Sequence, residues 1–202
     1  EWECFNAAEA VVRFQGFSIH PGDAKGRMVN AAELAHRFHS LLPAVQRPEY
    51  TSGYEGFYYL EGISGTVEHA TSRYIIRDHD AGKFQAKIDH LLSAVSFMNE
   101  EQGCERVTVE IKQQYRNMAE KVAQYPELIT LAKEAFAETG VEPNVIPIRG
   151  GTDGAQLSFR GLPCPNLSTG AYCCHGVNEF IPVKSLETMV DVLTHLVAKF
   201  AA

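Results

Sequence analysis

The order in which two hydrophobic periodicities follow each other restricts what the first part of this chain can form. Alternating apolar and polar residues mark a β-strand, and apolar residues three or four positions apart mark a helix. The patterns run strand, helix, strand, strand, helix, strand, at residues 8–14, 31–42, 56–64, 65–77, 84–95 and 107–111. This split βαβ order predicts a two-layer, ferredoxin-like α+β sandwich, with helices on one face of an antiparallel sheet. We place this domain at residues 7–117.

Local signals mark where these elements begin and end. The first strand runs into a loop that contains His20-Pro21-Gly22. Pro43 stops the first helix, because proline cannot continue one, and Asp80 stands where the second helix needs an N-cap.

Residues 118–202 follow a different pattern. Helical and strand-like segments alternate, at residues 126–139, 144–148, a short helix capped by Thr152 or Asp153, residues near 164–169, and a final helix that ends near Phe200. This αβαβα order suggests one edge of an α/β layer with too few strands for a stable sheet. We therefore expect a truncated part whose helices expose apolar side chains that further polypeptide normally covers, namely Leu131, Phe136, Leu193 and Phe200.

Composition excludes several classes of protein. The 202 residues carry a net charge of −7, whereas nucleic-acid binders usually show a basic face. No apolar run approaches the ~18 residues of a membrane span. Five cysteines without a framework spacing favour a reducing, cytoplasmic setting. We expect neither a nucleic acid nor a membrane as partner.

A short loop near the C-terminus carries one residue typical of a metal site. His175 lies in the stretch Cys173-Cys174-His175-Gly176-Val177-Asn178-Glu179 and can offer one ring nitrogen to zinc. A catalytic zinc takes about three protein ligands, and no convincing remainder is present, such as a His-Glu-x-x-His helix. The residues predict part of a metalloenzyme. Cys173 and Cys174 are expected to be buried and inert, since neighbours on a strand point to opposite faces.

Five stretches of the chain resemble the peptidase T family, the tripeptide aminopeptidases among the co-catalytic di-zinc exopeptidases. They are Ile19–Ala31, Gly53–Gly62, Tyr74–Asp80, Ile148–Gly170 and His175–Phe180. The most specific block reads Arg-Gly-Gly-Thr-Asp-Gly-Ala-Gln-Leu-Ser from Arg149 onward. The resemblance implies that the sandwich is a lid, or dimerisation, domain. Residues 118–202 would then be the C-terminal part of an α/β zinc-exopeptidase catalytic domain.

The resemblance also implies a zinc-dependent aminopeptidase that releases the N-terminal residue of tripeptides. In that family four of five metal ligands, and the glutamate general base, lie N-terminal to the segment seen here. Only the last ligand, His175, falls within it, so the chain would hold at most part of a site for two zinc ions. The implied partners are a short peptide substrate, the N-terminal half of the same enzyme, and a second copy bound through the lid domain.

Two further positions carry roles in this interpretation. The backbone of His20 is extended because Pro21 follows it. By resemblance, its counterpart reaches across a dimer and donates a hydrogen bond to the oxyanion in the partner's site. Arg149 precedes Gly150 and Gly151, whose lack of side chains lets a ligand approach the backbone. Its guanidinium suits the C-terminal carboxylate of a peptide.

Thr152 and Asn117 complete the candidate substrate-binding residues. The simpler alternatives are an ordinary surface histidine at position 20 and a structural ion pair between Arg149 and Asp153. For the whole chain, the alternatives are a non-catalytic dimerisation and substrate-binding module, or a fragment of a related deacylase or dipeptidase.

Overall fold

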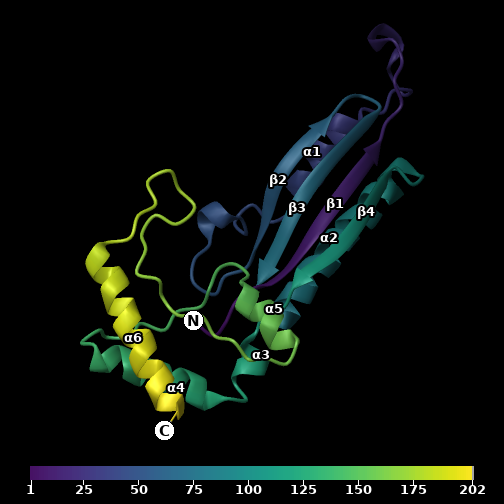
Figure 1. The fold of residues 1–202 in the computed structure, drawn as a ribbon. Helices are drawn as coiled ribbons and strands as arrows, with labels where there is room; N and C mark the ends of the chain where they lie inside the picture. Colours follow the sequence, from purple (N-terminus) through teal and green to yellow (C-terminus); the bar gives the residue numbers. More distant parts are fainter. Residues whose placement is uncertain (202) are drawn as a thin grey trace. The chain divides into compact units, whose positions relative to one another are not determined.

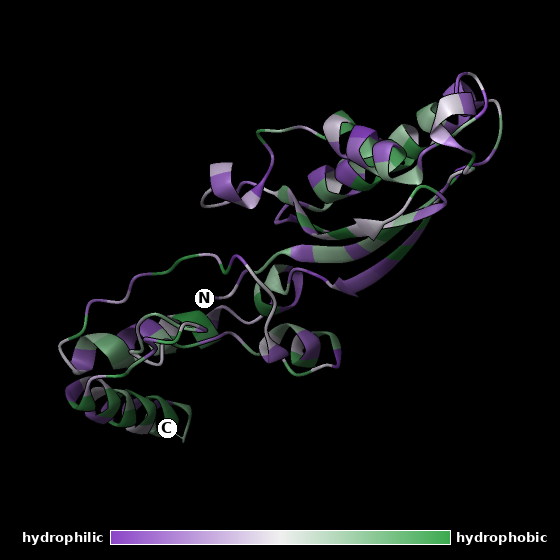
Figure 2. Cartoon of the chain, turned by 90° about the horizontal axis from the view of Figure 1, so that it is seen from above, coloured by the Kyte–Doolittle hydropathy of each residue, from purple (hydrophilic) through white to green (hydrophobic). Residues whose placement is uncertain are grey.

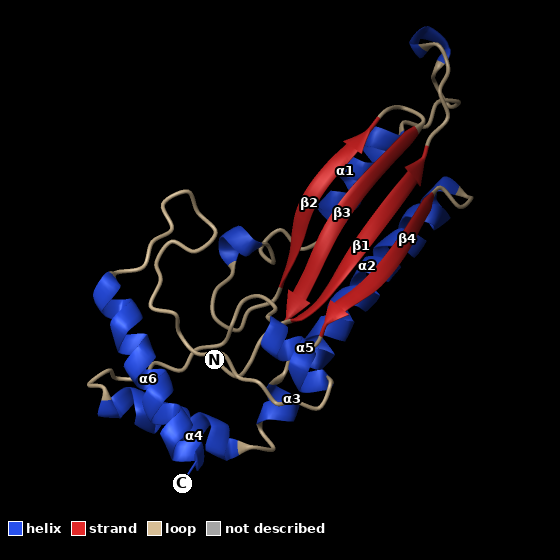
Figure 3. Ribbon diagram, viewed as in Figure 1, coloured by secondary structure: helices blue, strands red, loops and turns tan. Residues whose placement is uncertain are grey.

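A four-stranded antiparallel sheet forms the middle of the first of two compact units, Phe5–Arg116, called the sandwich unit below. The computed structural model describes residues 1–201. The strands, in chain order, are β1 (Asn6–Gln15), β2 (Phe57–Gly65), β3 (His69–Asp78) and β4 (Val107–Tyr115). They lie in the order β2-β3-β1-β4 (Figure 3). This is the arrangement that a split βαβ sequence produces, and it confirms the predicted ferredoxin-like sandwich.

Two helices cover one face of this sheet, α1 (Ala31–Leu41) and α2 (Ala81–Gln102) (Figure 1). The Asn30 side chain caps α1 by accepting a hydrogen bond from the amide of Ala32 at 3.0 Å. Asp80 caps α2 in the same way, as predicted, by accepting from the amide of Lys83 at 2.7 Å. Between α1 and β2 lies a short 3-10 turn, η2 (Pro48–Tyr50).

The core of the sandwich unit lies between the sheet and these helices. Along β1, alternate side chains are buried, and the outward-facing Arg13 instead pairs with Glu110. Phe38 of α1 packs between Phe14 and Tyr74, with ring centroids 5.7 and 5.9 Å apart. The apolar side chains on one face of the strands therefore pack against the apolar faces of the two helices and form one core.

The second unit, called the helical unit below, comprises Glu1–Cys4 and Asn117–Ala202. Its helices are α3 (Ala119–Val122), α4 (Pro126–Glu138), α5 (Asp153–Phe159) and α6 (Val183–Ala201). A small cluster of Cys4, Met118, Val122 and Ala155 is buried, and α4 packs against α6. Burial also raises the pKa of the Cys4 thiol. No local pattern indicates that the first four residues join this unit.

The two strands predicted in the helical unit, at residues 144–148 and near 164–169, do not form. Within residues 1–201 this unit contains no strand, and its only bridge joins Tyr172 to Phe180. The two segments are extended, but a strand exists only where a neighbour accepts and donates its backbone hydrogen bonds. Glu3 accepts a hydrogen bond from the amide of Ile148, and Glu1 and Asn166 bond each other reciprocally. These bonds do not extend into a ladder.

Much of the helix at the C-terminus, α6, consists of hydrophobic residues (Figure 2), and several of them are exposed. Leu193 is 47% exposed and Phe200 51%, as expected, whereas Val192 is fully buried. Leu131 and Phe136, which were also expected to be exposed, are half-buried. No helix within residues 1–201 combines the length and apolar character that crossing a bilayer requires.

Candidate functional site

The loop that carries His175 is a small structure closed at its base. Tyr172 and Phe180 form an antiparallel bridge, with hydrogen bonds of 2.9 and 3.2 Å, and their rings stack with centroids 5.3 Å apart. Inside the loop, the Glu179 carboxylate accepts a hydrogen bond from the amide of His175 at 3.0 Å. Glu179 therefore shapes the loop around His175.

The backbone of this loop is strained at two positions. Cys173 has φ = 54° and His175 has φ = 66°, values that residues with a Cβ rarely adopt and that often accompany functional sites. Cys173 and Cys174 are both exposed, so the prediction that they are buried is wrong. The alternation of faces on which it rested does not apply, because the segment turns instead of running as a strand.

The residues described do not make a complete metal site. No group of three or more His, Cys, Asp or Glu side chains within residues 1–201 is placed to hold a metal ion. No side chain in that part of the chain bonds the ring of His175, which is exposed. One imidazole falls short of the three protein ligands of a catalytic zinc. The chain alone does not fit zinc, although His175 could serve as one ligand of a shared site.

The candidate substrate-binding residues 149–152 form the approach to α5. The Thr152 hydroxyl caps this helix by accepting a hydrogen bond from the amide of Ala155 at 3.3 Å, one of the two caps considered from the sequence. Arg149 and Gly150 are half-buried, and Gly151 is exposed. The segment therefore holds Arg149 immediately before the N-terminus of α5.

Gly154, which sequence reasoning did not single out, is needed for this arrangement. A Cβ on this residue would lie 2.4 Å from the carbonyl oxygen of Cys164 and 2.8 Å from Oδ1 of Asn166. The first turn of α5 thus packs backbone to backbone on the extended segment around Asn166. A glycine in the first turn of a predicted helix was the available signal.

Asn117 has a structural task whatever else it does. Its Oδ1 accepts hydrogen bonds from the amide of Cys4 at 3.1 Å and from the amide of Ala119 at 3.0 Å. The side chain therefore ties residues 1–4 to the start of α3. A role in substrate contact stays a prediction.

His20 belongs to the sandwich unit, whereas the other candidates belong to the helical unit. It caps a 3-10 turn, η1 (Pro21–Asp23), and its Nδ1 accepts a hydrogen bond from the amide of Gly22 at 3.1 Å. The side chain is exposed. The loop extends beyond the end of β1 (Figure 1), and a bridge between Phe17 and Val29 closes its base.

A second histidine of the sandwich unit is partly buried. Nδ1 of His39 lies 3.3 Å from the hydroxyl of Tyr74. Burial, and then the nearby Arg47 and His36, lower the pKa of His39. His39 therefore completes the packing of α1 on β3, and the structure offers no reason to treat it as a ligand.

The helical unit contains a large apolar cavity of about 720 Å³. Helices α4 and α6 line it together with the extended segments around Val145 and Leu167. Protein interiors are close-packed and hold few voids larger than a water molecule. A cavity of this size in a small unit indicates a surface that another group covers.

The sequence matches curated proteins along its whole length. It is 45% identical to peptidase T of Bacillus subtilis over 202 residues, which is 100% of this chain and 49% of that protein. It is 50% identical to peptidase T of Parabacteroides distasonis over 198 residues, 98% of this chain and 48% of that protein. The chain is homologous to peptidase T. It spans about half the length of the curated relatives it matches.

Two further comparisons agree with this homology. Residues 3–102 match the family described as a peptidase dimerisation domain. The fold matches that of aminopeptidase PepT from Bacillus cereus with a TM-score of 0.83 and 22% identity, over 100% of this chain and 53% of that chain. A tripeptidase from Staphylococcus aureus gives a TM-score of 0.84 at 19% identity, over 96% of this chain and 52% of that chain. At these identities the structures establish the fold alone.

The comparison with peptidase T also bears on the helical unit. Peptidase T relatives are about twice as long as the matched segment, so they contain polypeptide that this segment lacks. Within the described residues, the helical unit combines an exposed apolar face on α6 with a cavity of about 720 Å³.

Proposed function

We propose that this chain is part of a zinc-dependent, peptidase T-like aminopeptidase that releases the N-terminal residue from tripeptides. The observation that carries the proposal is identity of 45–50% to peptidase T across nearly all of the chain. The identity includes both units, so it is not limited to a shared dimerisation domain.

In this proposal the chain supplies substrate contacts and one metal ligand. His175 holds one zinc ion through a ring nitrogen, and the remaining ligands and the general base come from the other half of the enzyme. Bound zinc would supply a water activated for attack on the peptide carbonyl. Arg149 clamps the C-terminal carboxylate of the peptide in two parallel hydrogen bonds, at a point where Gly150 and Gly151 leave room for it. Thr152 and Asn117 supply the further substrate contacts of this proposal.

The sandwich unit acts as a lid and as the dimer contact. Its match to a peptidase dimerisation domain supports a second copy as partner. His20, on the loop beyond β1, then donates its hydrogen bond to the oxyanion in the partner's site. An enzyme of this design works only as a dimer.

In this proposal the other half of the enzyme, the complementing polypeptide, binds in the cavity of the helical unit. Beyond the cavity, α6 also exposes Leu193, Val197 and Phe200, which are 47, 68 and 51% exposed. That is more surface than a small ligand covers. The backbone of residues 144–147 makes no hydrogen bond to another segment within residues 1–201, so an added strand can pair there.

The second candidate is a non-catalytic dimerisation and substrate-binding module, and it applies to the chain on its own. The absence of a complete ligand group from residues 1–201 favours it. A fragment of a related deacylase or dipeptidase is a weaker alternative. The fold is shared more distantly with an amidase of the hydantoinase/carbamoylase family from Burkholderia multivorans, at a TM-score of 0.66 and 15% identity.

Metal content and activity test the proposal together. We expect the chain alone to bind less than one zinc ion and to hydrolyse no leucyl tripeptide. Combined with its complementing polypeptide, it should bind about two ions and hydrolyse the tripeptide. His175→Ala in the complex should lower kcat/KM by at least about a hundredfold, because one ligand is lost, whereas His36→Ala on the exposed face of α1 should not. Two tightly held ions in the chain alone would contradict the proposal.

The substrate clamp has its own test. Arg149→Lys keeps the charge but loses the bidentate geometry. We expect it to raise KM about tenfold for tripeptides with a free C-terminus and to leave KM nearly unchanged for C-terminal amides. An equal rise for both substrates would show that Arg149 acts through the structure and not on the carboxylate.

A further inference from the structure

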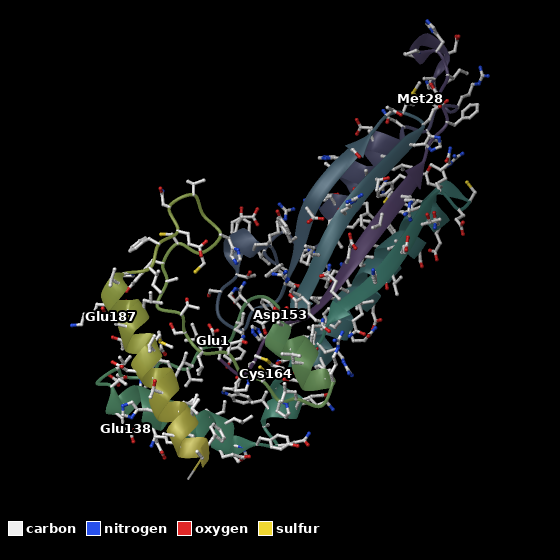
Figure 4. The ribbon with its side chains drawn as sticks, viewed as in Figure 1. Glu1, Met28, Glu138, Asp153, Cys164 and Glu187 are labelled. Carbon is white, nitrogen blue, oxygen red and sulfur yellow. The ribbon has the colours of Figure 1, made fainter. Side chains whose placement is uncertain are left out.

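The loop that carries His20 has a fixed base and a fixed tip. At the base, Phe17 and Val29 exchange two backbone hydrogen bonds of 2.7 and 3.1 Å. At the tip, the amide of Asp23 donates to the carbonyl of His20 at 2.9 Å, which closes the turn η1. Figure 4 marks the returning side of this loop with Met28. A loop held at both ends presents its side chains in a defined direction.

The turn also constrains the imidazole itself. The amide of Gly22 donates to Nδ1 of His20 at 3.1 Å. An amide nitrogen can only donate, so Nδ1 must be the ring nitrogen without a proton. In a neutral imidazole the other nitrogen then carries it. No other hydrogen bond to this ring occurs within residues 1–201, and Nε2–H is left as a donor on an exposed loop.

We infer that the Pro21-Gly22 turn is a positioning device that holds His20 in the Nε2–H tautomer, so that the ring acts as a hydrogen-bond donor. Pro21 fixes the first residue of the turn at a φ near −65° and needs no partner for its missing N–H. Gly22 supplies the amide. Lysine could only donate from such a loop, whereas histidine accepts from the turn through one ring nitrogen and donates outward through the other.

Gly22 is required for a second reason. A Cβ at this position would lie 3.1 Å from Nδ1 and 3.2 Å from Cε1 of His20. Gly22→Ala would therefore push the ring away and lengthen the hydrogen bond without removing any polar group. This makes Gly22→Ala a probe of ring position that leaves the chemistry of His20 intact.

The tautomer can be measured on the 202-residue chain without any enzymatic activity. Nitrogen-15 NMR of the imidazole, at a pH where histidine is neutral, distinguishes a protonated ring nitrogen from an unprotonated one. We expect Nε2 of His20 to be protonated and Nδ1 to be unprotonated, with a ratio of at least about ten to one. Gly22→Ala should lower that ratio, and Ser18→Ala, a neighbouring exposed residue of the loop, should not. A protonated Nδ1, or equal populations of the two forms, would overturn the inference.

The consequence for catalysis rests on the proposed function and is tested in the complemented enzyme. Glutamine can place an amide N–H near the position of Nε2, and asparagine near that of Nδ1. We therefore expect His20→Gln to keep at least about ten times more kcat than His20→Asn, with similar KM values. Gly22→Ala should lower kcat about tenfold, since small misplacements of a catalytic donor are costly.

The NMR measurement and the kinetic measurement test different parts of the inference and can contradict them independently. If NMR shows the Nε2–H form but His20→Ala leaves kcat unchanged, the catalytic role of His20 is wrong and the positioning by the turn stands. If NMR shows the Nδ1–H form, the positioning is wrong whatever the kinetics show. Equal loss of kcat in the Gln and Asn variants would also count against a donor at Nε2.

Discussion

The two units of this chain differ in how completely they bury their apolar side chains. In the sandwich unit, each apolar strand face meets a helix of the same unit, and residues such as Phe38 and Leu91 are fully buried. In the helical unit, α4 and α6 bury little besides each other, and Phe200 stays about half exposed. The first unit contains the helices that cover one face of its sheet, whereas the second unit contains only some of the partners that its helices require. A pattern of hydrophobic residues therefore identifies a surface that must be covered, but it does not say which chain covers it.

Hydrogen exchange of the chain alone should separate the two units most strongly. Amides in the centre of β1 and β3 can exchange only when the sandwich unit opens, at a cost of about 5 kcal/mol or more. Within residues 1–201 the amides of residues 144–146 have no hydrogen-bond partner, so they should exchange at nearly the rate of an unfolded chain. The expected difference is about a thousandfold or more. Mass spectrometry of peptic peptides provides the measurement, and uniform protection of residues 126–201 in a monomer would contradict the comparison.

A matched pair of leucine substitutions tests the same contrast in free energy. Leu91 in α2 is fully buried, and Leu193 in α6 is 47% exposed. We expect Leu91→Ala to lower the free energy of unfolding of the sandwich unit by about 3 kcal/mol, because it leaves a cavity. Leu193→Ala should change the stability of the chain by less than about 0.5 kcal/mol. Urea denaturation measures both changes. A large loss in Leu193→Ala would mean that α6 already has a partner.

The same contrast explains how far the sequence could predict the structure. The caps at Asp80 and Thr152 depend on neighbours in sequence, and the structure contains both of them. Whether residues 144–148 form a strand depends on a partner far along the chain, and that partner is not supplied within residues 1–201. The bond from Ile148 to Glu3 joins residues 145 positions apart (148 − 3 = 145), which no local pattern reveals.

The candidate site shows the same limit. The His175 loop could be located from its residues, but its left-handed backbone at Cys173 and His175 could not, because neither residue type requires it. The assignment of roles to His20, Arg149, Asn117 and His175 stays a prediction. In the proposed enzyme their chemistry would depend on groups from a second polypeptide or a second copy.

Alkaline pH should destabilise the sandwich unit through its buried tyrosines. Burial raises the pKa of Tyr74 to about 12, and it raises the pKa of Tyr58 as well. Above the ordinary tyrosine pKa of about 10 the unfolded chain loses this proton while the folded unit keeps it, so stability falls as pH rises. For Tyr74 the loss is about 1.4 kcal/mol per pH unit between about 10 and 12. Tyr74→Phe should remove the part of the alkaline stability loss that Tyr74 causes, as measured by urea denaturation at pH values from 9 to 12. Tyr172→Phe on the exposed loop of the helical unit should not.

The smallest effect should come from the charged cluster between α4 and α6. Nζ of Lys199 lies 3.1 Å from Glu134 and 2.6 Å from Glu138, and Nδ1 of His195 lies 2.9 Å from Glu138 (Figure 4 labels Glu138). The hydrogen bond from Lys199, and next the one from His195, lower the pKa of Glu138. The bonds to Glu138 and Glu134 raise the pKa of Lys199.

The direction of each pKa shift determines the pH range in which that residue stabilises the folded chain. The contribution of Glu138 is complete above its ordinary pKa of about 4.5 and disappears as pH falls through the lowered folded value. The contribution of Lys199 is complete below about 10.5 and disappears as pH rises through the raised one. Because Glu138 is exposed and Lys199 is only partly buried, both contributions are small. Local exchange in α6 should therefore increase slightly at acidic pH, and Glu138→Gln should abolish that increase while Asp191→Asn on the same helix retains it. If acid left α6 unaffected in the unsubstituted chain, the ion pairs between α4 and α6 would contribute nothing to holding the two helices together.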